Sequence, residues 1–186
     1  MSECIKVGMA DLKVCISPDS VTTLGLGSCV GIAIRDPITK IGGLAHVMLP
    51  DSGAIRNNTN VYKFADTGIE ELVVQMEKAG AKRNRMVAKI AGGAQMFSFQ
   101  NKTDLVRVGD RNVEASKKKL KELGIPILAE DTGLNFGRTV IFYPESGDYV
   151  IRAVGKEERV IWGEQKTVTA VAYAYSGRNY HAYGIF

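Results

Sequence analysis

Residues 21–50 (VTTLGLGSCVGIAIRDPITKIGGLAHVMLP) contain a thiol, an imidazole and a hydroxyl whose types and spacing suit covalent chemistry. A thiol beside an imidazole is a nucleophile paired with a base, and a hydroxyl can hold the imidazole in the useful tautomer. Cys29, His46 and Thr23 would supply these groups, with Thr23 six residues before Cys29. This set predicts nucleophilic catalysis, provided that the fold brings the three side chains together.

The segments around Cys29 and His46 read as a β-hairpin that would do so. Residues 29–35 alternate like a strand, residues 36–39 form a good turn because Asp and Pro favour its first two positions, and residues 41–49 return. With the two middle residues of that turn at its centre, Cys29 lies directly opposite His46 on one face. A two-residue shift of register keeps the pair on one face, whereas a one-residue shift separates it.

The segment before Cys29 reads as a glycine-rich loop, and Thr23 lies in the same loop. Its glycines would let the backbone approach a substrate closely, and the N–H of Ser28 or Cys29 would face a developing oxyanion. We therefore expect Gly25, Gly27 and Ser28 to bind the substrate or the oxyanion. A neighbouring imidazolium would also lower the pKa of the thiol from about 8.5 toward neutrality.

The same residues have an ordinary structural interpretation as well. A cysteine in an apolar strand is usually an inert core residue, and a histidine in a hairpin is usually hydrogen-bonded and half-buried. The residue types and spacing of Cys29 and His46 leave both interpretations open.

Bulk properties describe one globular domain and exclude several functional classes. The chain has 186 residues, of which 45% are hydrophobic and 24% charged, as expected for one domain with a full core. A net charge of +4 is too small and dispersed for a nucleic-acid-binding surface. No apolar stretch is long enough for a signal peptide or a membrane-spanning helix. The cysteines at positions 4, 15 and 29 lack CxxC spacing, so we expect a cytoplasmic protein without disulfides or zinc.

Hydrophobic periodicity predicts two main helices among several strands. The first helix is expected over residues 61–79, between Asn60 as N-cap and Gly80, and the second over residues 110–123, with Asp110 as N-cap. Further strands are expected at residues 5–16 (one or two strands), 85–91, 125–130, 138–143 and 149–154. Consecutive hairpins favour mixed, largely antiparallel sheets, so the predicted fold class is α/β without a doubly wound parallel sheet.

Several segments together resemble one protein family. TLGLGSCVGIAIRD followed by GGLAHVMLPDSG closely resembles the CheD family, the chemoreceptor glutamine deamidases of bacterial and archaeal chemotaxis. FADTGIEELVVQM, AKIAGGAQMF and GDRNVEASKKKLKELGIPILAEDTGLNFGRTV are similar to the same family in the same order, so the resemblance covers residues 5–155. The catalytic Cys, His and Thr of the family correspond here to Cys29, His46 and Thr23.

This resemblance implies a layered α/β sandwich with helices on one side. It implies a cysteine-dependent amidohydrolase that deamidates specific glutamine side chains of methyl-accepting chemoreceptors to glutamate and releases ammonia, with no metal or organic cofactor. It also implies a partner in CheC, the phosphatase of the response regulator CheY, and places the glycines at 92–93 beside the active site. Residues 1–155 would form the deamidase domain, and residues 156–186 a C-terminal extension with a strand at 167–175 and an aromatic tail.

Two other functional classes stay open. A non-catalytic adaptor would bind chemoreceptors or the CheC phosphatase through the same loop and would not need the thiol of Cys29. A different Cys-His enzyme, such as a peptidase or a transglutaminase-like transferase, would share the acyl-enzyme and differ in its product. Loss of turnover in Cys29→Ser and release of free ammonia would distinguish the deamidase from both.

Overall fold

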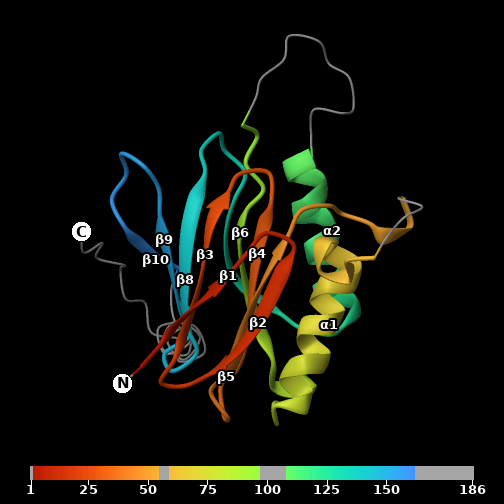
Figure 1. Cartoon of the computed structure of the whole chain (residues 1–186), viewed down its shortest axis with the longest axis vertical. Coiled ribbons are helices and arrows are strands. Elements are labelled where there is room, and N and C mark those ends of the chain that lie inside the picture. The colour runs from red at the N-terminus through yellow and green to blue at the C-terminus, as the bar shows by residue number, and fades with distance from the viewer. Residues whose placement is uncertain (1, 55–58, 97–107, 162–186) are drawn as a thin grey trace, which may run out of the picture.

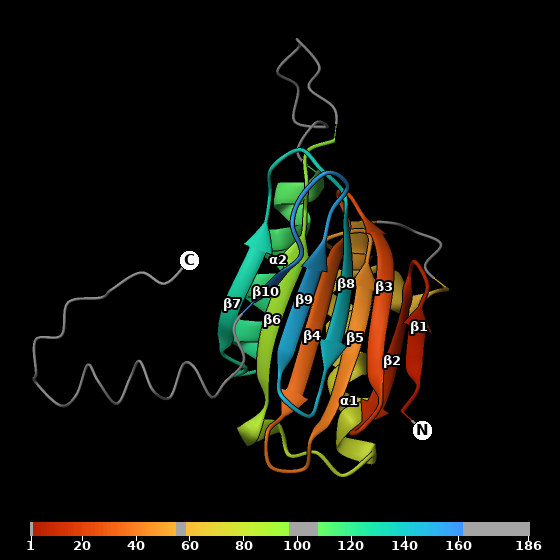
Figure 2. The same cartoon turned by 90° about the vertical axis from the view of Figure 1, so that its left-hand side faces the viewer.

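The structure of the protein, a computed structural model, describes residues 2–54, 59–96 and 108–161. Within them the chain forms three layers, which are two face-to-face β-sheets and a pair of helices on the outer side of one sheet (Figure 1). Figure 2 shows the helix-free sheet in front of the second sheet, with the helices behind both. The arrangement confirms the predicted α/β fold class with mixed, largely antiparallel sheets.

The outer sheet, which carries no helices, contains in spatial order β1 (Cys4–Val7), β3 (Ser20–Leu26), β8 (Arg138–Tyr143), β9 (Asp148–Arg152) and β10 (Arg159–Ile161). The central sheet contains β2 (Asp11–Ile16), β5 (Ile41–Val47), β4 (Val30–Asp36), β6 (Val87–Gly92) and β7 (Ile127–Thr132). The pairs β1–β3 and β6–β7 are parallel, and the other neighbouring strands are antiparallel. The segment predicted at residues 5–16 is therefore two strands, which belong to different sheets.

Two apolar cores hold the layers together. The core between the sheets includes Val21, Leu26, Leu44, Phe142 and Tyr149. The core between the central sheet and the helices includes Ile32, Ile34, Ile69, Leu72 and Leu120. Because strand side chains alternate, β4 and β5 send residues into both cores, and every residue of these two strands is buried.

The first helix, α1, spans Ala65–Lys78, within the predicted range. Its end agrees with the prediction, since Gly80 follows it with a φ of 109°. Its start is later than predicted, because the Asn60 side chain accepts from the Tyr62 N–H and caps a separate 3-10 turn, Val61–Lys63.

The second helix, α2 (Val108–Glu122), also matches the periodicity of the sequence. Asp110 lies inside its first turn, so the predicted N-cap is wrong. The buried face of α2 carries two polar residues, Asn112 and Ser116, beside the apolar Val113.

The β4–β5 hairpin has a longer turn than predicted. Asp36 pairs with Ile41, because the buried Asp36 carboxylate accepts hydrogen bonds from backbone N–H groups inside the loop and widens it. The register is therefore shifted by two residues, and Gly31 instead of Cys29 lies directly opposite His46. A shift of two leaves each side chain on its predicted face.

Residues 20–26, predicted as part of a glycine-rich loop, form strand β3. Its register against β8 shifts between Thr23 and Leu26, which is a β-bulge. Gly25 lies in this bulge with a φ of 72°, a conformation that glycine adopts far more easily than other residues. The glycine pattern that suggests a loop is here the signature of a bulged strand.

Strand β10 belongs to the predicted C-terminal extension and pairs antiparallel with β9. The strand predicted at residues 167–175 and the aromatic tail lie outside the described residues. None of the helices in the described part of the chain is long and apolar enough to cross a membrane.

Candidate active site

The imidazole of His46 and the hydroxyl of Thr23 meet between the two sheets. His46 comes from β5 and Thr23 from β3, and both side chains are fully buried. His46 Nδ1 lies 2.8 Å from Thr23 Oγ1. The hydroxyl proton is already used, because Thr23 Oγ1 donates to the Val7 carbonyl at 2.8 Å. Thr23 therefore accepts from His46, and the proton of the neutral imidazole is on Nδ1.

The other ring nitrogen of His46 is consequently a proton acceptor. With the proton on Nδ1, Nε2 carries a lone pair. Nε2 is buried and has no hydrogen-bond partner among the described residues. Burial lowers the pKa of His46 from 6.5 to about 4, so the ring is neutral at pH 7. Such a nitrogen is suited to take a proton from a nucleophile.

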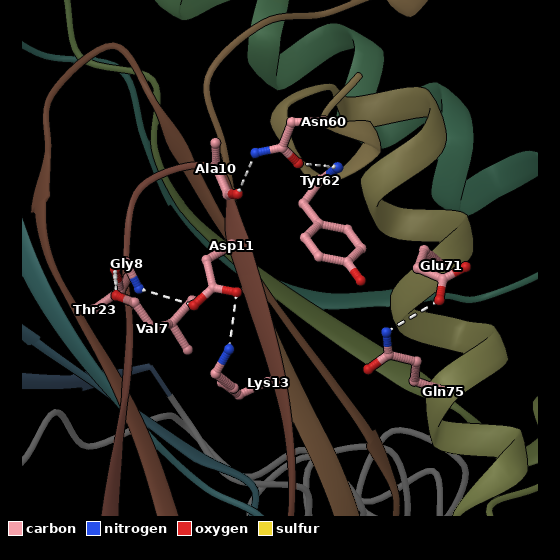
Figure 3. A network of polar contacts seen from close by, with 10 residues as sticks. All are labelled: Val7, Gly8, Ala10, Asp11, Lys13, Thr23, Asn60, Tyr62, Glu71 and Gln75. Carbon is pink, nitrogen blue, oxygen red and sulfur yellow. Dashed lines mark hydrogen bonds and ion pairs between the residues drawn. The ribbon is translucent and has the colours of Figure 1, made fainter. Parts of the chain in front are cut away.

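The carbonyl that fixes the Thr23 hydroxyl belongs to Val7, the last residue of β1, directly before the connection to β2. Figure 3 shows Thr23 bonded to Val7 and, nearby, Asp11 accepting from a backbone N–H of this connection at 3.3 Å. At the far end of the connection, the Asn60 side chain donates to the Ala10 carbonyl at 3.0 Å. The orientation of His46 thus depends on a chain of contacts that begins outside its own sheet.

Cys29 lies directly before β4 and shares a face with His46. His46 pairs with Gly31, and residues two apart on a strand point the same way, so Cys29 lies diagonally from His46, within reach of a long side chain. Cys29 packs in the core between the sheets with 9% of its surface exposed. Thr23 and His46 are therefore in contact, and Cys29 lies at the same end of the sheets, where β4 begins and β5 ends.

The backbone carbonyl groups of Cys29 and of the two residues before it all accept hydrogen bonds, which hold this segment in place. The carbonyls of Gly27 and Cys29 accept from the backbone N–H groups of Ala94 and Gly93, at 2.7 and 2.8 Å respectively. The carbonyl of Ser28, between them, accepts from a side chain of α2 at 2.8 Å. Three carbonyls fixed in sequence leave this segment little conformational freedom.

The glycine pair after the β6 strand packs directly against this backbone. Gly92 and Gly93 have φ values of 111° and 65°. A Cβ on Gly92 would lie 2.3 Å from the Cys29 carbonyl oxygen, and one on Gly93 would lie 2.3 Å from Val113 Cγ2. Only glycine lets the end of β6 fit between Cys29 and α2, which places the pair beside Cys29 as the sequence suggests.

The resting protonation state differs from the expectation of a thiolate beside an imidazolium. Burial raises the pKa of the Cys29 thiol, and a hydrogen bond from its own backbone N–H opposes only part of this effect. Burial likewise disfavours the charged form of His46. Both groups are therefore neutral at pH 7.

The predicted substrate-binding or oxyanion residues lie on the approach to Cys29. The Gly27 N–H donates to the Gly25 carbonyl at 2.9 Å, so this N–H is used inside the loop. The Cys29 N–H lies beside the sulfur of the same residue. Of these two N–H groups, the one on Cys29 is thus the better placed to meet an oxyanion.

Asn112 contacts this site and is not among the residues predicted from the sequence. Its side-chain amide reaches the Ser28 carbonyl at 2.8 Å and the Met48 carbonyl at 2.9 Å. The sequence does contain a signal for it. Asn112 and Ser116 are four residues apart on the face of α2 that carries Val113, where a polar side chain is costly unless it is hydrogen-bonded.

No group of three or more His, Cys, Asp or Glu side chains is placed to hold a metal ion within residues 2–54, 59–96 and 108–161. The three cysteines are free thiols.

Comparison with known proteins adds the family. The model of a family described as CheD chemotactic sensory transduction matches residues 48–153. The probable chemoreceptor glutamine deamidase CheD of Lachnoclostridium phytofermentans is 62% identical over 161 residues, which are 87% of this chain and 100% of that protein. The protein of the same name from Caldanaerobacter subterraneus subsp. tengcongensis is 55% identical, over 83% of this chain and 95% of that protein. The chemoreceptor glutamine deamidase CheD of Halalkalibacterium halodurans is 51% identical, over 87% of this chain and 100% of that protein.

These matches extend over most of the chain and over nearly the full length of each relative. Cys29, His46 and Thr23 are the positions to which the sequence resemblance assigns the catalytic residues of the family. By family model and by close relatives alike, this chain belongs to the CheD family.

Proposed function

We propose that this protein is a chemoreceptor glutamine deamidase in which Cys29 is the nucleophile, His46 the general base and acid, and Thr23 the residue that orients His46. One observation carries the assignment of residues: the Thr23 hydroxyl donates to Val7 and accepts from His46, which leaves Nε2 unprotonated on the face that Cys29 shares. The family supplies the reaction and the substrate class, since all three relatives bear the name chemoreceptor glutamine deamidase.

The first half of the reaction forms an acyl-enzyme. Nε2 of His46 takes the thiol proton as the sulfur of Cys29 attacks the side-chain amide carbon of a glutamine, and a carbon–sulfur bond forms. The protonated His46 then gives its proton to the departing nitrogen. Ammonia leaves, and a glutamyl thioester remains on Cys29.

The second half of the reaction restores the enzyme. Water enters, and the neutral His46 takes one of its protons as the oxygen attacks the thioester carbon. The carbon–sulfur bond breaks, the thiolate of Cys29 regains a proton from His46, and glutamate is released. Atoms balance as one glutamine and one water giving one glutamate and one ammonia, without a cofactor.

Both halves pass through a tetrahedral oxyanion next to Cys29. The Cys29 N–H is better placed for it than the Gly27 N–H, because it lies beside the sulfur that attacks. Ser28, Gly27 and Gly25 shape the loop on which this donor is carried and complete the proposed substrate-binding segment.

The test is mass spectrometry of a methyl-accepting chemoreceptor cytoplasmic fragment after incubation with wild-type protein or with Cys29→Ala. We expect a gain of about one mass unit at specific glutamines and stoichiometric ammonia, both absent with the variant. Tight binding to the fragment without any mass change would favour the adaptor. A cleaved chain or an amine adduct would favour a peptidase or a transferase.

The proposal extends to a partner and a compartment. We expect a CheC phosphatase to bind the protein, as the family resemblance implies, and co-purification of the two tests it. A cytoplasmic location is supported by three free thiols, which a reducing compartment preserves.

A further inference from the structure

Three consecutive carbonyls, those of residues 27–29, accept hydrogen bonds, and Asn112 is the only side chain among the donors described above. The carbonyls of Gly27 and Cys29 are held by backbone N–H groups after β6. The carbonyl of Ser28 is held by Nδ2 of Asn112 at 2.8 Å. A substitution of Asn112 can therefore release the Ser28 carbonyl while the bonds to the Gly27 and Cys29 carbonyls stay in place, which makes its function open to experiment.

The same amide also reaches the strand that carries the base. Nδ2 of Asn112 donates to the Met48 carbonyl at 2.9 Å, two residues beyond His46. The amide thus bridges the segment of Cys29 and the segment of His46. Asn112 is completely buried on α2, which packs against α1 and against β4, β6 and β7 of the central sheet.

That packing is tight at the backbone level. A Cβ on Gly109, in the first turn of α2, would lie 2.5 Å from the Gly93 carbonyl oxygen and 2.8 Å from that of Ala94. The helix therefore approaches the loop as closely as its backbone allows. Ser116 adds a hydrogen bond of 2.7 Å to the Asn112 carbonyl one turn later.

The bonded carbonyl belongs to the same peptide unit as the N–H of the nucleophile. In a trans peptide the C=O of Ser28 and the N–H of Cys29 point in opposite directions within one plane. Fixing the carbonyl toward α2 therefore aims the N–H away from α2, toward the face on which the sulfur lies. Rotation of this one plane would move the donor away from the reacting carbon.

The amide of Asn112 is retained at a cost. Its Oδ1 is buried and has no hydrogen-bond partner among the described residues. A buried acceptor without a partner costs about 1–3 kcal/mol, which an apolar side chain of similar size would avoid. In return, the two N–H donors on Nδ2 make hydrogen bonds to the Ser28 and Met48 carbonyls.

We infer that Asn112 is a positioning residue that orients the Ser28–Cys29 peptide so that the Cys29 N–H meets the oxyanion of the deamidation reaction. The inference rests on the proposed function, because it assigns to Asn112 the alignment of the donor beside the proposed nucleophile. The amide bonds the Ser28 and Met48 carbonyls, and the inference assigns its effect on the reaction to the bond with Ser28.

The experiment compares two rates in Asn112→Ala and Asn112→Asp, both in the full chain. One rate is kcat for ammonia release from a chemoreceptor cytoplasmic fragment. The other is alkylation of Cys29 by iodoacetamide at pH 9, which needs the thiol but no oxyanion donor. Asn112→Asp keeps the shape of the side chain and loses its donors when ionised. Thr22→Val is the control, because it removes one side-chain hydrogen bond of 2.8 Å, to the Val140 carbonyl, and Thr22 contacts neither Asn112 nor the carbonyls that Asn112 holds.

We expect kcat to fall about 10²-fold in both Asn112 variants, with KM and the alkylation rate within about twofold of wild type. Thr22→Val should keep all three values. An unchanged kcat, a parallel fall of kcat and alkylation, or variants that fail to fold would each overturn the inference, since the last two make Asn112 a general structural support. Absence of ammonia release by the wild type is a distinct result, which overturns the proposed function itself.

Discussion

At the scale of single residues, burial sets the state in which the site rests. The Cys29 thiol and the His46 imidazole share one face at the end of the sheets, and both lose their charged forms to desolvation. A thiol that stays protonated until substrate arrives resists adventitious oxidation and alkylation, since the thiolate is the reactive species. The base needs no charge of its own, because its free Nε2 lone pair is sufficient.

The pH dependence of Cys29 alkylation follows from this state. Because burial raises the thiol pKa, we expect the iodoacetamide rate at Cys29 to keep rising with pH above the roughly 8.5 of a free thiol. Peptide mass spectrometry measures alkylation of Cys29 separately from that of the exposed Cys4, whose alkylation serves as the internal control for reagent activity. A rate plateau near neutral pH would mean a thiolate–imidazolium pair and contradict the neutral resting state.

Removal of the Thr23 hydroxyl should misorient the base. Thr23→Val deletes the acceptor of the His46 Nδ1 proton, so the ring loses its fixed tautomer, and kcat should fall at least tenfold, by a rough estimate. Thr22→Val is the matched control, because Thr22 Oγ1 donates to the Val140 carbonyl at 2.8 Å, away from His46. Equal kcat for the two variants would remove Thr23 from the mechanism.

At the scale of elements, the site exists where several chain segments end together. In Figure 1 the start of β4, the ends of β5 and β6, and the first turn of α2 meet at one end of the central sheet. Two of these contacts require glycine at the end of β6. The position of Cys29 is thus set by elements that contribute no reactive group.

A side chain at the end of β6 should therefore displace Cys29 by pressing on its backbone carbonyl. Gly92→Ala places a Cβ 2.3 Å from the Cys29 carbonyl in addition to a φ of 111°, so we expect a stability loss of about 2–4 kcal/mol and a parallel loss of kcat. Gly124→Ala has a φ of 70° but no atom within 4 Å, and should cost about 1 kcal/mol with kcat unchanged. Denaturant unfolding and ammonia release measure both, and similar losses in the two variants would exclude the contact with Cys29 as the cause.

Local sequence patterns predicted most elements and named Cys29, His46 and Thr23 as candidates, and the family resemblance favoured their catalytic interpretation. The hairpin around Cys29 and His46 could be predicted because its strand and turn residues are close in the sequence. The predicted register was wrong by two residues, which still placed each side chain on the correct face of the sheet. Strand β3 was missed, because the bulge at Gly25 has the composition of a loop. Asn112 was missed because its partners are distant in the sequence, and no local pattern reports a contact of that range.

At the scale of the whole molecule, the partition of strands between two sheets was beyond the sequence patterns. β1 and β2 are joined by three residues, yet they lie in different layers, and β1 pairs in parallel with β3. Hydrophobic alternation indicates that a strand has a buried face, but it does not indicate to which of two sheets the strand belongs. The site depends on this partition, because Thr23 and His46 come from opposite sheets.

The buried His46 should make the whole fold sensitive to acid. Its pKa is about 4 in the folded chain against 6.5 unfolded, so the unfolded state binds more protons between these values. The free energy of unfolding should therefore fall by about 2–3 kcal/mol from this residue as pH drops from 6.5 to 4, and be independent of it above that window. Denaturant titrations of wild type and His46→Gln at pH 7 and 4.5 isolate the effect, and an identical pH dependence in both would contradict it.

The bridge from Asn112 to Ser28 spans 84 positions of the chain. At about 5–20 residues per second, a ribosome adds the helix roughly 4–17 s after it has added the thiol. Until then the nascent chain carries Cys29 and His46 without the amide that steadies the peptide between Ser28 and Cys29. The contact that we infer to align this peptide can therefore form only after about three fifths of the 186 residues have been made.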